Sequence, residues 1–362
     1  MHILIVLLIA YYAFNFLFLN YIYFGLKKYY KKIKYKEKET GKEILLQEKY
    51  GYAIPTDSLN YFSFVIIGLL LFSFRNFLVY IIFLLLKIHL KILKYIYKNH
   101  GKDENQRLKL EKAVYFWLTL YFIINNISTQ KKQIKYEEIY KKYLGEDYDF
   151  SQKDFSMYIS NHLGFLEFPA FAREYGVSFL LQDESKRHPL IGGALAEFGS
   201  VFVKLQSKES RKKALDTILK RQNDFYNKKN FIKTLNFPEG TTTNGKYIGN
   251  FKKGSFISLL PIKPLILFPN DDYPCYSHQF FSFLRTLTSF KVRIIYAELP
   301  IIKPTNYMYE KYKNLGKEKW EIYSNVVNKI YSEIGGFKQV SIDYRNNILY
   351  QKIVNDDFYV DK

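Results

Sequence analysis

The chain has 362 residues with a formal net charge of +20, and aromatic residues make up 19% of it. Its single cysteine, Cys275, excludes an internal disulfide framework and a cysteine-based zinc site. So many tyrosine and phenylalanine side chains are typical of a protein that lies at the membrane–water interface. The positive charge fits either nucleic acid or an anionic membrane surface, and the apolar segments decide between these two partners.

Residues 3–26 contain no charged side chain. At about 1.5 Å per residue, a helix of this length spans roughly 36 Å, which is enough to cross a hydrocarbon core about 30 Å thick. A secretory signal peptide would need a basic start, a shorter apolar stretch and a small-residue cleavage site, which this segment lacks. We therefore predict a transmembrane helix at residues 1–26. The basic loop at residues 27–58 is lysine-rich, which places it on the cytoplasmic or matrix side.

Residues 59–113 hold a second apolar region, which is interrupted by Arg75 and Asn76. Each half is too short to cross a bilayer, and lysine-rich segments lie on both sides, so we predict a re-entrant membrane hairpin of two half-helices. The alternative is one long, tilted helix in which Arg75 reaches back to the interface. Four lysines between residues 87 and 98 recur at helical spacing among isoleucines and leucines, which predicts an interfacial amphipathic helix.

Residues 114–338 have the pattern of a globular domain, and residues 339–362 form a polar C-terminal tail. Short apolar runs predict strands, and longer periodic runs between them predict helices. The predicted strands are 155–160, 177–181, 200–203, 232–237, 264–268 and 291–299, and the helices are 168–175, 193–198, 207–226 and 317–334. This alternation favours an α/β domain with a mostly parallel sheet flanked by helices.

Two segments that follow predicted strands carry the chemistry. The first, SNHLGFLE at residues 160–167, contains His162 and Glu167. A histidine can remove the proton of a hydroxyl nucleophile when a carboxylate fixes its tautomer and stabilises the imidazolium that forms. The second, FPEGTTTNGK at residues 237–246, offers backbone N–H groups and hydroxyls that suit a phosphate. Parallel sheets bind ligands at the carboxyl ends of their strands, where both segments are expected.

The run FPEGTTTNGKYIGNFKKGSF at residues 237–256, together with the first segment, resembles the glycerol-3-phosphate and lysophospholipid acyltransferase family. The resemblance is closest to the lysophosphatidylcholine acyltransferase branch and extends over residues 155–299. It implies transfer of a fatty acyl group from acyl-CoA to a lysophospholipid hydroxyl at a membrane surface, without a metal or redox cofactor. It also implies that His162 is the general base, that Glu167 orients it, and that a further set of residues contacts substrate. This set is Asn161, Lys204, Glu239, Gly240, Thr241 and Thr242.

The chain departs from the family pattern at two places. Glu167 stands where the family normally has aspartate, and Lys204 and Leu205 stand where it has an Asp-Arg pair. The lysine would grip a phosphate only as a point charge, without the two parallel hydrogen bonds of an arginine. These departures motivate an alternative, in which the chain is a catalytically silent subunit that gives structural or lipid-binding support to a larger membrane complex.

We expect membrane phospholipids and acyl-CoA as partners, with other subunits in the silent case. We do not expect nucleic-acid binding, because the charge lies next to apolar segments and no recognition motif is present. An endoplasmic reticulum membrane fits the family's usual setting, and a mitochondrial inner membrane fits the subunit hypothesis.

Overall fold

The computed structural model describes residues 2–27, 34–36, 43–45, 61–188, 191–205, 207–270, 273, 284 and 286–341. Most of the predicted basic loop at 27–58 and of the predicted tail at 339–362 lies outside the described residues. The two short strands that are described in the basic segment, β1 (Lys34–Lys36) and β2 (Glu43–Leu45), pair antiparallel.

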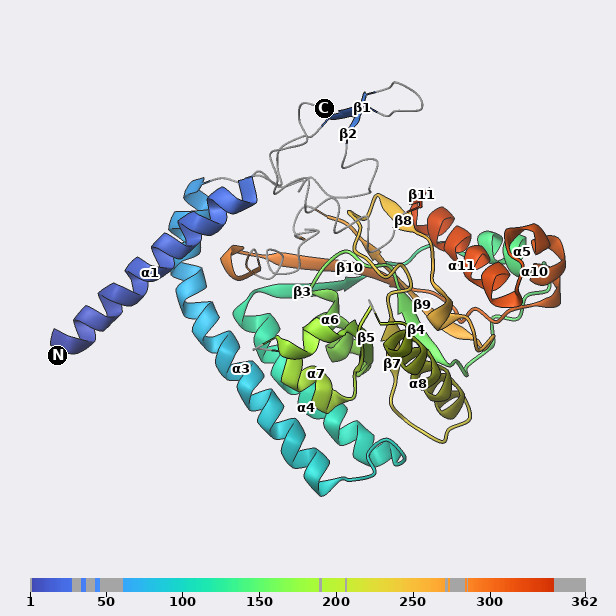
Figure 1. The fold of residues 1–362 in the computed structure, drawn as a ribbon, viewed down its shortest axis with the longest axis horizontal. Coiled ribbons are helices and arrows are strands. Elements are labelled where there is room, and N and C mark those ends of the chain that lie inside the picture. The colour runs from blue at the N-terminus through green and yellow to red at the C-terminus, as the bar shows by residue number, and fades with distance from the viewer. Residues whose placement is uncertain are drawn as a thin grey trace.

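A seven-stranded sheet forms the centre of the molecule (Figure 1). Its strands run in the order β3-β10-β9-β4-β7-β5-β6, and every neighbouring pair is parallel except β9 and β10. The strands are β3 (Ile127–Lys131), β4 (Met157–Ser160), β5 (Ser178–Gln182), β6 (Val201–Val203), β7 (Thr234–Asn236), β9 (Ile262–Phe268) and β10 (Val292–Glu298). β8 (Tyr247–Gly249) pairs separately with β11 (Lys338–Val340). The predicted mostly parallel α/β sheet is therefore confirmed.

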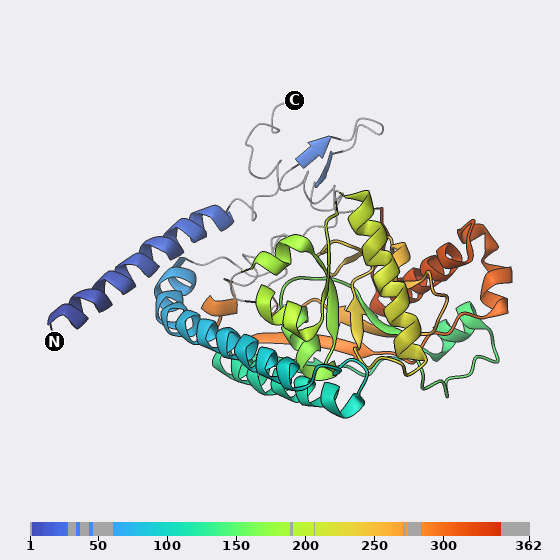
Figure 2. The same cartoon turned by 60° about the horizontal axis from the view of Figure 1, so that its bottom comes forward.

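Helices cover both faces of this sheet (Figures 1 and 2). Alternate residues of a strand point to opposite faces, so β9 sends Leu265 and Leu267 into one apolar core and Ile262 and Ile266 into the other. The first core contains α3 (Gly68–Ile96), α4 (Glu104–Ile124), α6 (Glu167–Tyr175) and α7 (Gly192–Phe198). The second contains α5 (Glu137–Leu144), α8 (Lys208–Tyr226) and α11 (Lys319–Gly335), with α10 (Asn306–Lys311) beside them.

The N-terminal helices differ from the predicted hairpin. α1 (His2–Lys27) is a long apolar helix, as predicted, but the predicted break at Arg75 and Asn76 is wrong, because α3 runs through both residues without interruption. The chain reverses after α3, and α4 packs back along it, so the hairpin consists of two complete helices. The predicted amphipathic helix is the last part of α3 rather than a separate element.

Arg75 explains why the apolar helix tolerates a charge. Its side chain is 6% exposed and points into the protein, where Nε donates to the carbonyl of Ile124 at 3.1 Å. Nη1 donates to the carbonyls of Leu287, at 3.3 Å, and Ser289. A buried guanidinium needs hydrogen-bond acceptors, and here they come from the end of α4 and from the segment before β10. Arg75 therefore fastens α3 to the globular domain instead of reaching toward the membrane interface.

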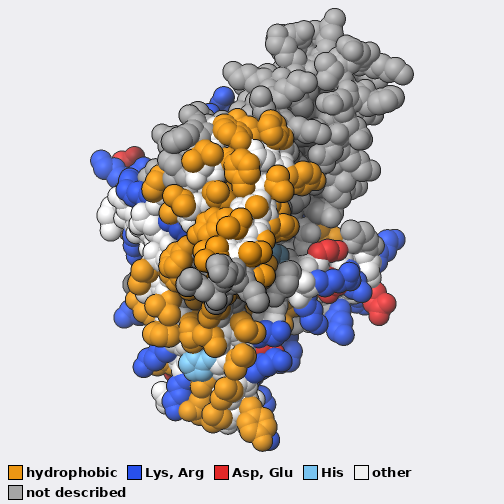
Figure 3. All heavy atoms as spheres, turned by 90° about the vertical axis from the view of Figure 1, so that its left-hand side faces the viewer, with side chains coloured by type: hydrophobic (Ala, Val, Ile, Leu, Met, Phe, Trp, Pro, Cys, Tyr) orange, Lys and Arg blue, Asp and Glu red, His pale blue; other side chains and the backbone are white. Residues whose placement is uncertain are grey.

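The opposite face of α3 is exposed and apolar. Its side chains recur every three or four residues and form one stripe along the helix: Leu70, Phe74, Phe77, Ile81, Leu84, Ile88, Ile92 and Tyr95. Figure 3 shows this face as a broad hydrophobic surface with lysines and arginines around its lower part. Residues 5–24 and 64–96 are both long and apolar enough to cross a bilayer. Membrane association of these two helices is consistent with this surface.

Arg107 is a second buried arginine, and it joins α4 to two helices of the globular domain. Its Nη1 donates to the carbonyl of Phe198 at the end of α7 (3.0 Å), and its Nη2 donates to the carbonyl of Gly176 at the end of α6 (3.2 Å). Nε donates to Glu111 at 3.2 Å, and Lys233 pairs with the other oxygen of that carboxylate at 2.7 Å. One buried guanidinium thus satisfies the carbonyl ends of two helices.

Replacing Arg107 with methionine is expected to destabilise the fold by about 3–5 kcal/mol, because two buried carbonyls and Glu111 each lose a donor. The measurement is the midpoint of thermal unfolding in detergent micelles. The matched control is Arg211→Met, since the guanidinium of Arg211 is at the exposed surface and, among the described residues, donates to the carbonyl of Leu205. Equal midpoints for the two variants would contradict the structural role of Arg107.

Candidate active site

Two turns meet at the carboxyl ends of the neighbouring parallel strands β4 and β7. The turn after β4 carries His162, and the turn after β7 carries Glu239 and the threonines. The backbone N–H of Thr243 donates to the carbonyl of His162 at 2.8 Å. In return, the backbone N–H of His162 donates to Oε1 of Glu239 at 2.9 Å. The two sequence segments that were predicted to carry the chemistry therefore form one rigid unit.

Aromatic rings fix the plane of the His162 imidazole. The ring of Phe237 stacks on it with a centroid distance of 4.3 Å and an interplanar angle of 19°. Phe168 meets it edge to face at 5.6 Å. The histidine side chain is 9% exposed, so only a small part of it is open to solvent. The rings leave the imidazole little freedom to rotate away from its carboxylate partner.

Glu167 begins α6 and is completely buried. Its Oε2 lies 2.5 Å from Nδ1 of His162. Its Oε1 accepts the backbone N–H groups of Leu163 and Gly164, both at 2.5 Å, and the hydroxyl of Tyr273 at 3.1 Å. A carboxylate acceptor at Nδ1 selects the tautomer that carries its proton on Nδ1, which leaves the Nε2 lone pair for a substrate proton. The glutamate therefore reaches the histidine despite its extra methylene.

Glu239 is also completely buried, and it links the two turns. Besides the His162 N–H, it accepts the backbone N–H of Gly249 through Oε2 at 2.7 Å. Burial raises the pKa of this carboxyl to about 8, although both backbone hydrogen bonds act in the opposite direction, and the charge of Glu167 adds to the rise. Both oxygens are occupied by backbone groups, so the contacts of Glu239 in the structure are those of a positioning residue.

The other predicted substrate contacts occupy different surroundings. Asn161 bonds the backbone N–H and carbonyl of Leu267 in β9, at 2.7 and 3.0 Å. Gly240 is exposed and has a φ of 69°, in the left-handed region that glycine adopts without strain. Thr241 and Thr242 are buried beside the histidine turn, and Oγ1 of Thr242 has no hydrogen-bond partner within the described part of the chain. Contact of these four residues with substrate stays a prediction.

Lys204 is not part of this cluster. It is exposed directly after β6, which β7 and β5 separate from β4, a distance of about 14 Å across the sheet. Its backbone N–H donates to Oγ of Ser210. The structure thus places Lys204 at the rim of the same carboxyl edge, where a phosphate grip by this residue stays a prediction. No three His, Cys, Asp or Glu side chains among the described ranges lie close enough to hold a metal.

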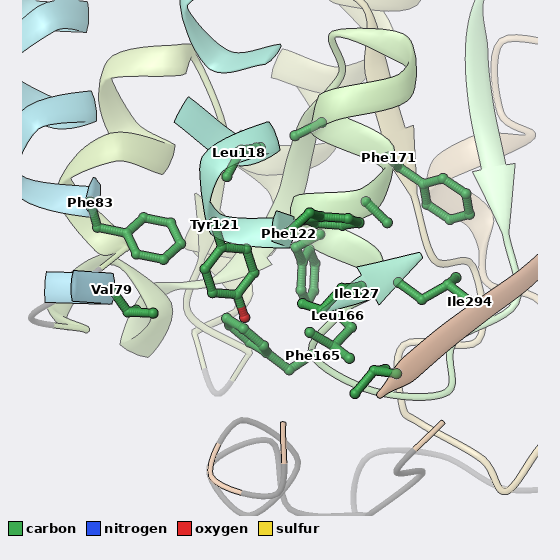
Figure 4. Close-up of a cluster of buried hydrophobic side chains, with 14 of the residues drawn as sticks. Val79, Phe83, Leu118, Tyr121, Phe122, Ile127, Phe165, Leu166, Phe171 and Ile294 are labelled. Atoms are coloured by element: carbon green, nitrogen blue, oxygen red, sulfur yellow. The ribbon is translucent and has the colours of Figure 1, made fainter. Parts of the chain in front are cut away.

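An apolar pocket that the sequence did not predict lies beside the turn. Its walls come from α3, α4, α6 and α7, and Phe165 and Phe168 of the histidine turn and α6 form part of the lining. Figure 4 shows the adjoining cluster, in which Tyr121 of α4 lies between Phe83 of α3 and Phe165. The other unpredicted site residue is Tyr273, which stands in a loop without a recognisable motif. No local pattern could have identified either feature, because both depend on contacts between distant segments.

The raised pKa of Glu239 predicts a pH-dependent stability. A carboxyl with a raised folded-state pKa stabilises the fold fully below its unfolded value near 4.5, and this contribution is lost as the pH rises through about 8. Between these two pH values, titration of Glu239 changes the free energy of unfolding by at most about 1.4 kcal/mol per pH unit. Glu239→Gln should therefore remove the decline in unfolding midpoint between pH 5 and 8 that the wild type shows. The variant should also be less stable at low pH, because an amide cannot accept both backbone N–H groups.

Unfolding midpoints in detergent micelles across this pH range provide the measurement, with the exposed Glu138→Gln as the control that keeps the wild-type decline. A wild-type slope that persists in Glu239→Gln would show that another group causes it.

Comparison with known proteins agrees with this geometry. Residues 145–269 match the model of the family described as Acyltransferase. Lysophospholipid acyltransferase LPEAT1 of Arabidopsis thaliana is 32% identical over 110 residues, which is 30% of this chain and 28% of that protein. Lysophosphatidylcholine acyltransferase 2 of Homo sapiens is 33% identical over 110 residues, which is 30% of this chain and 20% of that protein. The matched segment thus spans less than a third of each relative.

Among solved structures, the 1-acyl-sn-glycerophosphate (LPA) acyltransferase PlsC from Thermotoga maritima aligns with a TM-score of 0.45 and 13% identity, over 73% of this chain and 97% of that chain. The match to the family covers both turns of the site, including His162, Glu167 and Glu239. Residues 145–269 are therefore similar to the acyltransferase family over the region that forms both turns of the site.

Proposed function

We propose that the protein transfers a fatty acyl group from acyl-CoA to the hydroxyl of a lysophospholipid at a membrane surface. The observation that carries this proposal is the buried His162–Glu167 pair, in which the carboxylate holds Nδ1 and leaves Nε2 directed away from it. No described residue forms a hydrogen bond with Nε2. This is the arrangement that a general base needs before a substrate hydroxyl arrives.

The reaction would proceed by direct attack of the hydroxyl on the thioester. Nε2 of His162 takes the hydroxyl proton while the oxygen attacks the carbonyl carbon of acyl-CoA. The buried negative charge of Glu167 stabilises the imidazolium that results. When the tetrahedral intermediate collapses, the carbon–sulfur bond breaks and the sulfur of CoA receives the proton from the imidazolium. The products are a phospholipid with two acyl chains and free CoA.

The surroundings of the pair support both substrates. The pocket between α3, α4, α6 and α7 is lined by apolar side chains that include Phe165 and Phe168, and Phe168 also contacts the His162 ring, so the pocket suits a fatty acyl chain. In the turn after β7, the Oγ1 of Thr242 is buried without a partner in the described chain, which suits an oxygen of the substrate. Asn161, Glu239, Gly240 and Thr241 complete the two turns around it, and Lys204 adds charge at the rim.

One of the two arguments for the catalytically silent alternative is weakened by the position of Glu167. The glutamate at position 167 was a reason to doubt activity, yet its carboxylate lies at hydrogen-bond distance from Nδ1. The missing arginine after β6 remains as the other motive. We place the domain on the cytoplasmic or matrix side of an endoplasmic reticulum or mitochondrial inner membrane, with the first location favoured by the active function.

The test of the function is acyl transfer by the purified protein, with labelled acyl-CoA and a panel of lysophospholipids. His162→Ala and Glu167→Gln should each lower kcat on the order of 10³-fold, because the first removes the base and the second removes the charge that supports it. His100→Ala, in the turn between α3 and α4, is the control and should keep wild-type activity. A folded, lipid-binding wild type that forms no product with any acceptor would support the silent-subunit alternative.

A substitution that narrows the pocket is expected to change the preference for the chain length of acyl-CoA. Ala194 of α7 lines the pocket and is 5% exposed, so leucine at this position should fill part of the space for the acyl chain. The loss of two buried methylene groups of substrate, at about 0.8 kcal/mol each, should lower kcat/KM for long-chain relative to medium-chain acyl-CoA by about tenfold.

The matched control is Ala214→Leu, since Ala214 is similarly buried but lies in α8 and packs into the second core. A similar change of preference in both variants would show that overpacking, rather than occupation of the pocket, is responsible.

A further inference from the structure

Tyr273 connects the chain after β9 to the candidate active site. Its hydroxyl donates to Oε1 of Glu167 at 3.1 Å, and the residue is 4% exposed. It lies five residues after the end of β9, whose neighbour in the sheet is β4. The backbone N–H of Tyr273 donates to the carbonyl of Asn270, and the side-chain amide of Asn270 donates to the carbonyl of Arg293 in β10. The tyrosine is thus anchored to the two antiparallel strands of the sheet.

The carboxylate of Glu167 has two oxygens with different tasks. Oε2 faces Nδ1 of His162, whereas Oε1 accepts three donors. Two of these donors, the N–H groups of Leu163 and Gly164, belong to the same turn as the histidine and move with it. Tyr273 is the one donor to Oε1 that comes from outside the turn and α6, according to the hydrogen bonds of the described residues. It therefore fixes the carboxylate relative to the sheet.

The length of the glutamate makes this external contact important. An aspartate would hold its carboxylate about 1.5 Å closer to the backbone of α6, with one rotatable bond fewer. The glutamate at position 167 gains reach toward Tyr273 but also gains a torsion that must be immobilised, and an orienting carboxylate tolerates only small displacements. A second buried carboxyl, Glu239, lies near enough to interact electrostatically with Glu167, so donors on Oε1 also offset the cost of its charge.

We propose that Tyr273 is a positioning residue for the acyl-transfer reaction. Its hydroxyl, with the N–H groups of Leu163 and Gly164, holds Oε1 of Glu167 so that Oε2 stays on Nδ1 of His162. Tyr273 thereby lets a glutamate serve in the place where the family normally has aspartate. This inference rests on the proposed function for its kinetic consequence, while the geometry of the His162–Glu167 pair can be read without turnover.

The experiment compares the wild type with Tyr273→Phe in the full chain in detergent micelles or vesicles. The variant keeps the ring and loses only the hydroxyl, so kcat should fall about tenfold, in line with the loss of a hydrogen bond to a charged group. KM for acyl-CoA and for the lysophospholipid should stay within about twofold, because Tyr273 does not touch either substrate in this proposal. The low-field NMR resonance of the His162 Nδ1 proton should move upfield, because the carboxylate is held less firmly against it.

Tyr140→Phe is the matched control. The Tyr140 hydroxyl is buried and donates to the carbonyl of Pro300 at 2.8 Å, in the second core and away from the site. It should leave kcat and the Nδ1 resonance unchanged. Glu167→Asp provides a second test: an aspartate does not reach Tyr273, so Tyr273→Phe should cost less than about threefold in that background.

Three results would overturn the proposal. They are an unchanged kcat in Tyr273→Phe, an unmoved Nδ1 resonance, or an equal fall in Tyr140→Phe. If the wild type transfers no acyl group to any acceptor, the proposed function fails, and the resonance alone decides on the positioning role. A resonance that moves in Tyr273→Phe and not in Tyr140→Phe then supports it.

Discussion

The arrangement of the site depends on the cost of burying the Glu167 carboxylate. An ionised carboxylate without partners costs several kcal/mol inside a protein, so its two oxygens must be hydrogen-bonded when the domain folds. The donors come from His162 and the turn after β4, and from Tyr273 after β9. These segments meet only when β4 and β9 are neighbours in the sheet. The order of the central strands is therefore a condition for the full set of donors to Glu167, and these hydrogen bonds in turn tie the strands together.

The two departures from the family pattern have different physical consequences. At position 167 the longer side chain is accommodated, because two backbone N–H groups and the Tyr273 hydroxyl donate hydrogen bonds to its carboxylate. At position 205, by contrast, leucine packs against the second core and offers no donor, and the neighbouring Lys204 is a flexible point charge at the rim. Within the described residues, the geometry thus compensates the change beside the proposed base and does not compensate the change at the proposed phosphate contact.

Much of the fold and half of the site could be predicted from the sequence, because these features depend on residues that are close together in the chain. The strands between residues 155 and 299 were predicted because apolar runs alternate with helical ones, and His162 and Glu167 were paired because both belong to one short turn. Features that depend on distant segments were missed. Arg75 was interpreted as a helix break, because its acceptors near residues 124 and 287–289 are invisible to any local pattern.

The hairpin of α3 and α4 links the pocket to the apolar surface of the molecule. The inner face of α3 supplies Phe83, Leu86 and Leu90 to the pocket, and its outer face carries the exposed stripe that includes Leu84 and Ile88. α3 has apolar side chains on two opposite faces, and the globular domain covers only one of them. A bilayer against the stripe would complete the burial and would place the pocket, one helix away, at the level of the acyl chains. The same packing that stabilises α3 would then bring the proposed base close to its lipid substrates.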